Sequence, residues 1–131
     1  MLYDLTPIMQ NINKPFIMVL QNRRVRELKA LIKVRPAQDD VTVTYAHDIH
    51  KLLTIKFDHA YCIVHLAELD PHGIVLVCHN QGLRNGYDCN QNLYPFFYVG
   101  DCYLADKDFN GLTDDQVKFI EEWLQSLKDH R

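Results

Sequence analysis

The strongest constraint on the fold of this chain is an amphipathic segment close to its C-terminus. Thr113 and Gln116 have the spacing of a capping box, which closes the first turn of a helix. Asp114 and Asp115 follow the cap, where the helix dipole favours acidic side chains. A helix with one apolar face must bury it, so we expect a two-layer α+β fold in which the helix covers a sheet. Its apolar positions are Val117, Phe119, Ile120, Trp123, Leu124 and Leu127, with Ile120, Trp123 and Leu124 expected in the core.

Several segments before this helix have strand character. Residues 41–45 alternate between apolar and threonine side chains, the pattern of a half-buried strand. Residues 70–73, with the sequence Asp-Pro-His-Gly, are turn-forming and lie between two apolar runs, which predicts a hairpin. We therefore expect an antiparallel sheet of about four to six strands. The other predicted strands are residues 16–20, 53–57, 61–69, 74–78 and 94–104, the last bent or broken at Gly100.

Two segments near the N-terminus are less clearly patterned. Thr6 and Pro7 resemble the start of a helix, with a possible cap followed by proline. Residues 23–34 fit both a helix and a strand by spacing, and their strong helix formers favour a helix. The predicted fold therefore has room for one or two N-terminal helices besides the C-terminal one.

The length and composition indicate one globular domain spanning residues 1–131. The chain is 47% hydrophobic and 24% charged, as in ordinary globular proteins, and its size permits either a monomer or a homodimer. The apolar run at residues 16–20 is too short to cross a membrane and lacks the flanks of a signal peptide. We expect a cytoplasmic protein with no membrane association, whose four cysteines are free thiols.

Charge is distributed unevenly along the chain. The net charge of −3 argues against direct nucleic-acid binding. Residues 21–36 are basic, and residues 101–131 carry eight acidic side chains against four basic ones. An acidic C-terminal segment of this kind can attract a basic partner.

Three patterns bear on chemistry. Residues 106–114 partly match a calcium-binding loop, but Val117 occupies the position that needs glutamate, so a turn leading into the helix is favoured. A four-residue hairpin turn at 70–73 would place His65 opposite Cys78, a pair that could support thiol catalysis. The histidines, including the pair His47 and His50, leave a divalent-metal site open, although no strong metal motif occurs. No cofactor is predicted.

Residues 79–92 form a long polar connection, and such loops are often functional. Asn85 and Gly86 favour a small type I′ hairpin that would present Arg84 and Tyr87 to a partner.

The function that these features favour is binding to another protein. The leading hypothesis is an inhibitor or immunity-type protein that neutralises a basic partner, such as a nuclease toxin. A small enzyme that uses Cys78 and His65, or a metal site, is the alternative. The residues predicted to bind the partner are Asp106, Asp108, Asp114, Asp115, Arg84, Asn85 and Tyr87.

Overall fold

The computed structural model describes residues 28–130, and their strands form one antiparallel sheet. The predicted helix at Thr6 and the predicted strand at residues 16–20 lie outside the described residues. The sheet has five strands in the order β2-β1-β5-β4-β3. The strands are β1 (Lys29–Val34), β2 (Val41–Ala46), β3 (Tyr61–Val64), β4 (Ile74–His79) and β5 (Cys102–Asp106), and the helices are α3 (Ile49–Lys56) and α4 (Asp114–Asp129).

The last strand in the sequence occupies the centre of the sheet. β1 and β2 form one hairpin and β3 and β4 another, and β5 lies between β1 and β4. Leu104 of β5 is therefore paired with Ile32 on one side and Leu76 on the other. This topology confirms the predicted α+β class and the predicted number of strands.

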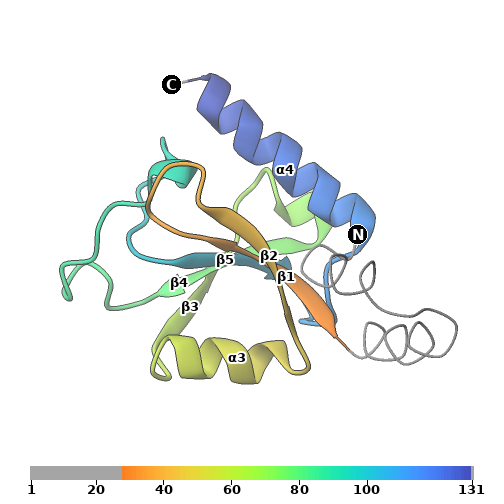
Figure 1. The fold of residues 1–131 in the computed structure, drawn as a ribbon, viewed down its shortest axis with the longest axis horizontal. Coiled ribbons are helices and arrows are strands. Elements are labelled where there is room, and N and C mark those ends of the chain that lie inside the picture. The colour runs from red at the N-terminus through yellow and green to blue at the C-terminus, as the bar shows by residue number, and fades with distance from the viewer. Residues whose placement is uncertain (1–27, 131) are drawn as a thin grey trace, which may run out of the picture.

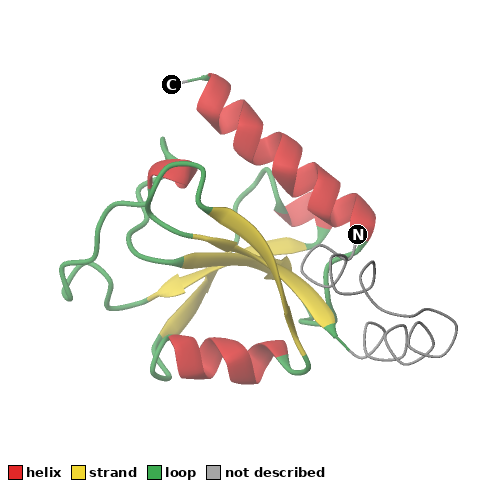
Figure 2. Ribbon diagram, viewed as in Figure 1, coloured by secondary structure: helices red, strands yellow, loops and turns green. Residues whose placement is uncertain are grey.

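A helix covers each face of the sheet, so the fold has three layers and not the two that we expected. Helix α4 covers one face and α3 covers the other (Figure 1). Because side chains alternate along a strand, each central strand contributes to both cores. In β5, Leu104 faces α4, whereas Tyr103 faces α3. Figure 2 shows the resulting three layers, with helices on either side of the strands.

Helix α4 forms as its local sequence predicts. Thr113 and Gln116 make the reciprocal capping box, and Ile120 and Trp123 are buried against the sheet. Leu124, however, is only half-buried, because it lies at the margin of the apolar face and borders a shallow groove.

Two predicted elements have the opposite secondary structure. In the segment 23–34, for which the sequence favours a helix over a strand, residues 29–34 form β1, where pairing on both sides outweighs helix propensity. Residues 23–27 of that segment lie outside the described residues. The predicted strand at residues 53–57 is the end of α3 and its C-cap Phe57. Two features of the sequence indicate this helix and were not recognised. They are the Asp48 cap and the buried residues Ile49, Leu53 and Phe57, which are spaced about one helical turn apart.

The strand predicted at residues 61–69 ends at Val64. A turn and a short 3-10 helix, Asp70–His72, complete the connection to β4. The longer connection shifts the register, so that Cys62 rather than His65 lies opposite Cys78. At the other end of the sheet, Gly100 adopts a positive φ of 74° and β5 starts two residues later, as the expected break at this glycine implies.

Candidate functional site

The connection from β4 to β5, residues 80–101, is fixed against the sheet by two buried asparagines. The side-chain amide of Asn90 donates hydrogen bonds to the carbonyl oxygens of Val34 and Gly100, both at 2.9 Å. The amide of Asn92 donates to the carbonyl oxygens of Arg35 and Ala37, both at 2.7 Å. These bonds attach the loop to the end of β1, so the loop presents its other side chains from a fixed base.

A row of aromatic rings extends from the α3 core to this loop. Tyr103, Phe57, His79 and Tyr87 contact one another in sequence, edge to face, with ring centroids 5.4 to 5.8 Å apart. Tyr87 packs on the backbone of Gly100, where a Cβ atom would lie 2.7 Å from the tyrosine ring. A glycine is therefore needed here both for its positive φ and for the close approach of the ring.

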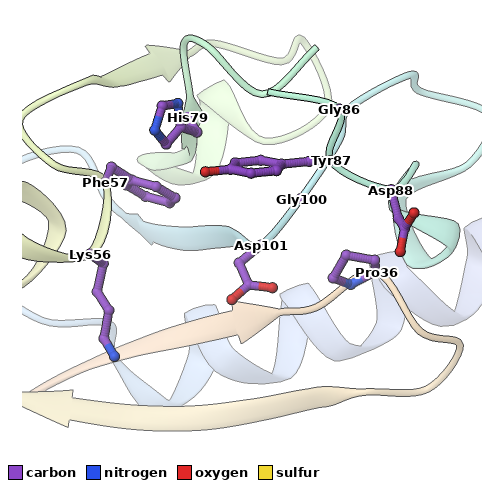
Figure 3. A pocket seen from close by; sticks show the side chains of 9 residues that line it. All are labelled: Pro36, Lys56, Phe57, His79, Gly86, Tyr87, Asp88, Gly100 and Asp101. Atoms are coloured by element: carbon purple, nitrogen blue, oxygen red, sulfur yellow. The ribbon is translucent and has the colours of Figure 1, made fainter. Parts of the chain in front are cut away.

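Beside these rings lies an open cleft of about 430 Å³ (Figure 3). It is bordered by the end of α3, the ends of β1 and β4, and the residues that precede β5. Figure 3 shows the rings of Phe57, His79 and Tyr87 on one side of the cleft, with Asp101 and Pro36 below them in the view. The lining residues are Pro36, Lys56, Phe57, His79, Gly86, Tyr87, Asp88, Gly100 and Asp101.

The polar groups of the cleft are suited to recognition. The Asp101 carboxylate lies 3.8 Å from both Lys33 Nζ and Arg35 Nε, longer than a hydrogen bond, so its oxygens can accept from a ligand. Nδ1 of His79 accepts the backbone N–H of Gln81 at 2.9 Å. This bond places the proton of the neutral imidazole on Nε2, which makes Nε2 a donor rather than a base. Among the described residues, those lining the cleft include no serine, threonine or cysteine.

A second, smaller groove of about 220 Å³ lies on the α4 side of the same loop. Leu83 and Phe97 border it, and their exposed fractions are 70% and 65%. Tyr94 and Tyr87 are also exposed, so four of the six exposed large hydrophobic side chains among residues 28–130 lie within residues 83–97. The other two are Ile55 and Ile63. We call residues 80–101 with the cleft and this groove the loop face.

The predicted loop residues lie on this face. Arg84 is exposed, and the amide of Asn85 donates to the hydroxyl of Tyr87 at 3.4 Å. The predicted type I′ hairpin does not form: residues 80–86 make successive turns, and of Asn85 and Gly86 only the glycine has a positive φ.

The predicted acidic residues lie at the opposite end of β5. Asp106 is buried, and its carboxylate oxygens accept the backbone N–H groups of Asn110 and Gly111, both at 2.8 Å. It therefore holds the turn before α4 and does not belong to an exposed patch. Asp108, Asp114 and Asp115 are exposed. The structure thus separates these acids from Arg84, Asn85 and Tyr87 by the length of a strand.

The predicted pairing of Cys78 with His65 is wrong. His65 lies beyond β3, with its Nδ1 atom 3.3 Å from an exposed carboxylate oxygen of Asp70, whereas Cys78 is buried beside Cys62. Burial, and to a smaller extent the neighbouring Cys62, together raise the pKa of the Cys78 thiol to about 12. Both effects disfavour the thiolate that nucleophilic catalysis needs.

Within residues 28–130, no three histidine, cysteine or acidic side chains are grouped so that they could hold a metal ion. The described helices are each too short or too polar to span a membrane. In comparisons with known proteins, no match to this chain was found among protein-family models, curated proteins or solved structures.

Proposed function

We propose that this chain is a protein-binding domain and that the loop face is its binding surface. The observation that carries the proposal is the concentration of exposed apolar side chains there, above all Leu83 and Phe97 on one groove. Water-exposed apolar groups gathered in one place are typical of interaction sites. Tyr87 and Arg84 also lie on the loop face, and tyrosine and arginine are enriched at protein interfaces.

The anchoring of the loop supports a role in binding. Asn90 and Asn92 donate to the backbone carbonyl oxygens of Val34 and Arg35 at the end of β1, and both side chains are buried. A surface already held in place loses little conformational entropy when a partner binds. Little of the free energy gained from contacts at the loop face is therefore lost in ordering the loop, and the rest strengthens binding.

The chemistry of the cleft favours a basic side chain from the partner. Asp101 already forms ion pairs with Lys33 and Arg35, whereas Asp88 makes none with the other described residues. The Asp88 carboxylate is therefore the group that would receive a basic side chain, with the exposed ring of Tyr87 in the same cleft. An arginine guanidinium binds carboxylates through paired hydrogen bonds and stacks on aromatic rings. The exposed Asp108, Asp114 and Asp115 lie at the opposite end of β5, so they do not belong to this surface. The Asp88 carboxylate and the Tyr87 ring favour the inhibitor or immunity-type hypothesis, in which the partner is a basic protein such as a nuclease toxin.

The test compares a double variant with a matched control. The full chain is used as bait in an extract of its native host, as wild type, as Leu83→Ser with Phe97→Ser, and as Ile55→Ser. Ile55 is as exposed as Phe97, at 63%, but lies on α3. We expect one protein to be retained by the wild type and the Ile55 variant and lost by the double variant. Equal retention by all three baits would contradict the proposal.

Binding kinetics with the purified partner then test its charge. Asp88→Asn should slow association at low salt, because this exposed carboxylate lines the cleft, and an exposed charge acts during encounter and is screened by salt. Tyr87→Ala should mainly speed dissociation and weaken binding by about tenfold or more, as expected for the loss of a packed contact. If the association rate of the wild type does not depend on salt, a basic partner is excluded. That result would not contradict binding through the apolar side chains of the loop face.

A further inference from the structure

Two cysteines face each other across the β3–β4 pair. Cys62 and Cys78 are paired in the register, and their Sγ atoms are 3.5 Å apart. Directly opposed residues of antiparallel strands have Cα atoms about 4.5 to 5.5 Å apart. Disulfides span Cα separations of about 4.4 to 6.8 Å, so the backbone already has the spacing that a disulfide needs.

The environment distinguishes this pair from the other thiols. Cys62 is half-buried on a strand at the edge of the sheet, and both Cys62 and Cys78 border the groove beside Leu83. The groove gives a small oxidant a path to the sulfur atoms. Cys102 is fully buried, and Cys89 is exposed on the loop, where its backbone pairs with Val99 in an isolated antiparallel bridge.

We propose that Cys62 and Cys78 form a site of reversible oxidation, at which a peroxide converts the two thiols into an intramolecular disulfide. The Cys62 thiolate attacks one peroxide oxygen, the O–O bond breaks, and a sulfenic acid and hydroxide are formed. The hydroxide takes up a proton to become water. The sulfur of Cys78 then attacks the Cys62 sulfur, the S–O bond breaks, and the departing hydroxyl takes the Cys78 proton as a second water. The two thiols lose two electrons, which reduce the peroxide.

The two cysteines have different roles in this sequence. Cys62 is the more accessible sulfur and meets the oxidant first. Cys78 stays protonated in the folded protein because its pKa is raised to about 12, so it is a poor target for the peroxide itself. Its contact with Cys62 makes the second step intramolecular, which compensates for its weak nucleophilicity. This inference does not depend on the proposed partner.

The experiment treats the reduced, full-length protein with hydrogen peroxide at low protein concentration, blocks the remaining thiols and maps the peptides by mass spectrometry. We expect a monomer that has lost a pair of hydrogen atoms, with residues 62 and 78 cross-linked and the link removed by dithiothreitol. Cys62→Ser should abolish the link, whereas Cys89→Ser should form it as the wild type does. If the link forms in Cys89→Ser, it did not arise by thiol–disulfide exchange with the exposed Cys89.

Three results would overturn the proposal. One is a wild-type protein whose Cys62 accumulates sulfinic acid while Cys78 stays reduced. The second is a cross-link that joins two chains or involves Cys89 or Cys102. The third is a link that appears only after denaturant is added. All three are read from the wild type, so the conclusion does not require that a Cys78 variant folds.

Discussion

Replacing Asn90 with alanine should detach the loop face from the sheet. Asn90 is fully buried, and its amide donates to two carbonyl oxygens, those of Val34 and Gly100. Its side-chain oxygen also accepts the N–H of Asn92 at 3.2 Å. Each lost hydrogen bond costs about 1 kcal/mol net, and each buried group left without a partner costs about 1 to 3 kcal/mol. We therefore expect Asn90→Ala to lower the free energy of unfolding by about 2 to 5 kcal/mol.

The assay is urea denaturation followed by tryptophan fluorescence, with Asn85→Ala as the matched control. Asn85 lies on the same loop but is exposed, and its one side-chain hydrogen bond is long. The control should change stability by less than about 0.5 kcal/mol. Hydrogen exchange gives a local readout, because the N–H of Gly100 bonds to Asp88 within the loop and should exchange faster in Asn90→Ala. A change below about 0.5 kcal/mol for Asn90→Ala would refute the view that this side chain anchors the loop.

Three further predictions concern packing, backbone and ionisation. Ile120→Ala should cost about 2 to 5 kcal/mol in urea denaturation, because the side chain is fully buried, and half-buried Leu124→Ala should cost clearly less. Gly100→Ala should destabilise more than Gly86→Ala in the same assay: both have positive φ, but only at Gly100 would the new methyl group collide with a ring. Stability should fall as the pH rises from about 9 to about 12, because the unfolded state then loses the Cys78 proton while the folded state keeps it. The free energy of unfolding of Cys78→Ala, measured by urea denaturation, should decline less over that pH range than that of the wild type. An identical decline would contradict the assignment of the pH dependence to Cys78.

The sequence by itself determined the elements whose signals are local. Helix α4 follows from the Thr113 cap and a stripe of apolar residues within one segment. Strand β2 follows from alternation in residues 41–45, and the break before β5 from Gly100. In each of these cases the physical cause acts between residues close together in the chain.

Only the tertiary structure decided the elements whose local signals conflict. Residues 29–34 carry helix formers, yet they are a strand because β2 and β5 pair with them from both sides. Residues 53–57 alternate like a strand, yet Leu53 and Phe57 are buried on one helical face under the sheet. Propensities amount to a few tenths of a kcal/mol per residue, and burial of a side chain to about 1.5 to 3 kcal/mol, so packing prevails.

The candidate sites depend on the same long-range contacts. The register that joins Cys62 to Cys78 was set by where β3 ends and how the residues after Val64 return to β4, which turn chemistry at 70–73 did not reveal. The cleft brings Pro36, Phe57 and Asp101 together from separate elements. The sequence suggests that Asp106 is a surface acid. It is buried because it lies at the end of the central strand, where its carboxylate accepts hydrogen bonds from two backbone N–H groups. Contacts between residues far apart in the chain depend on how the whole sheet assembles, and no short stretch of sequence carries that information.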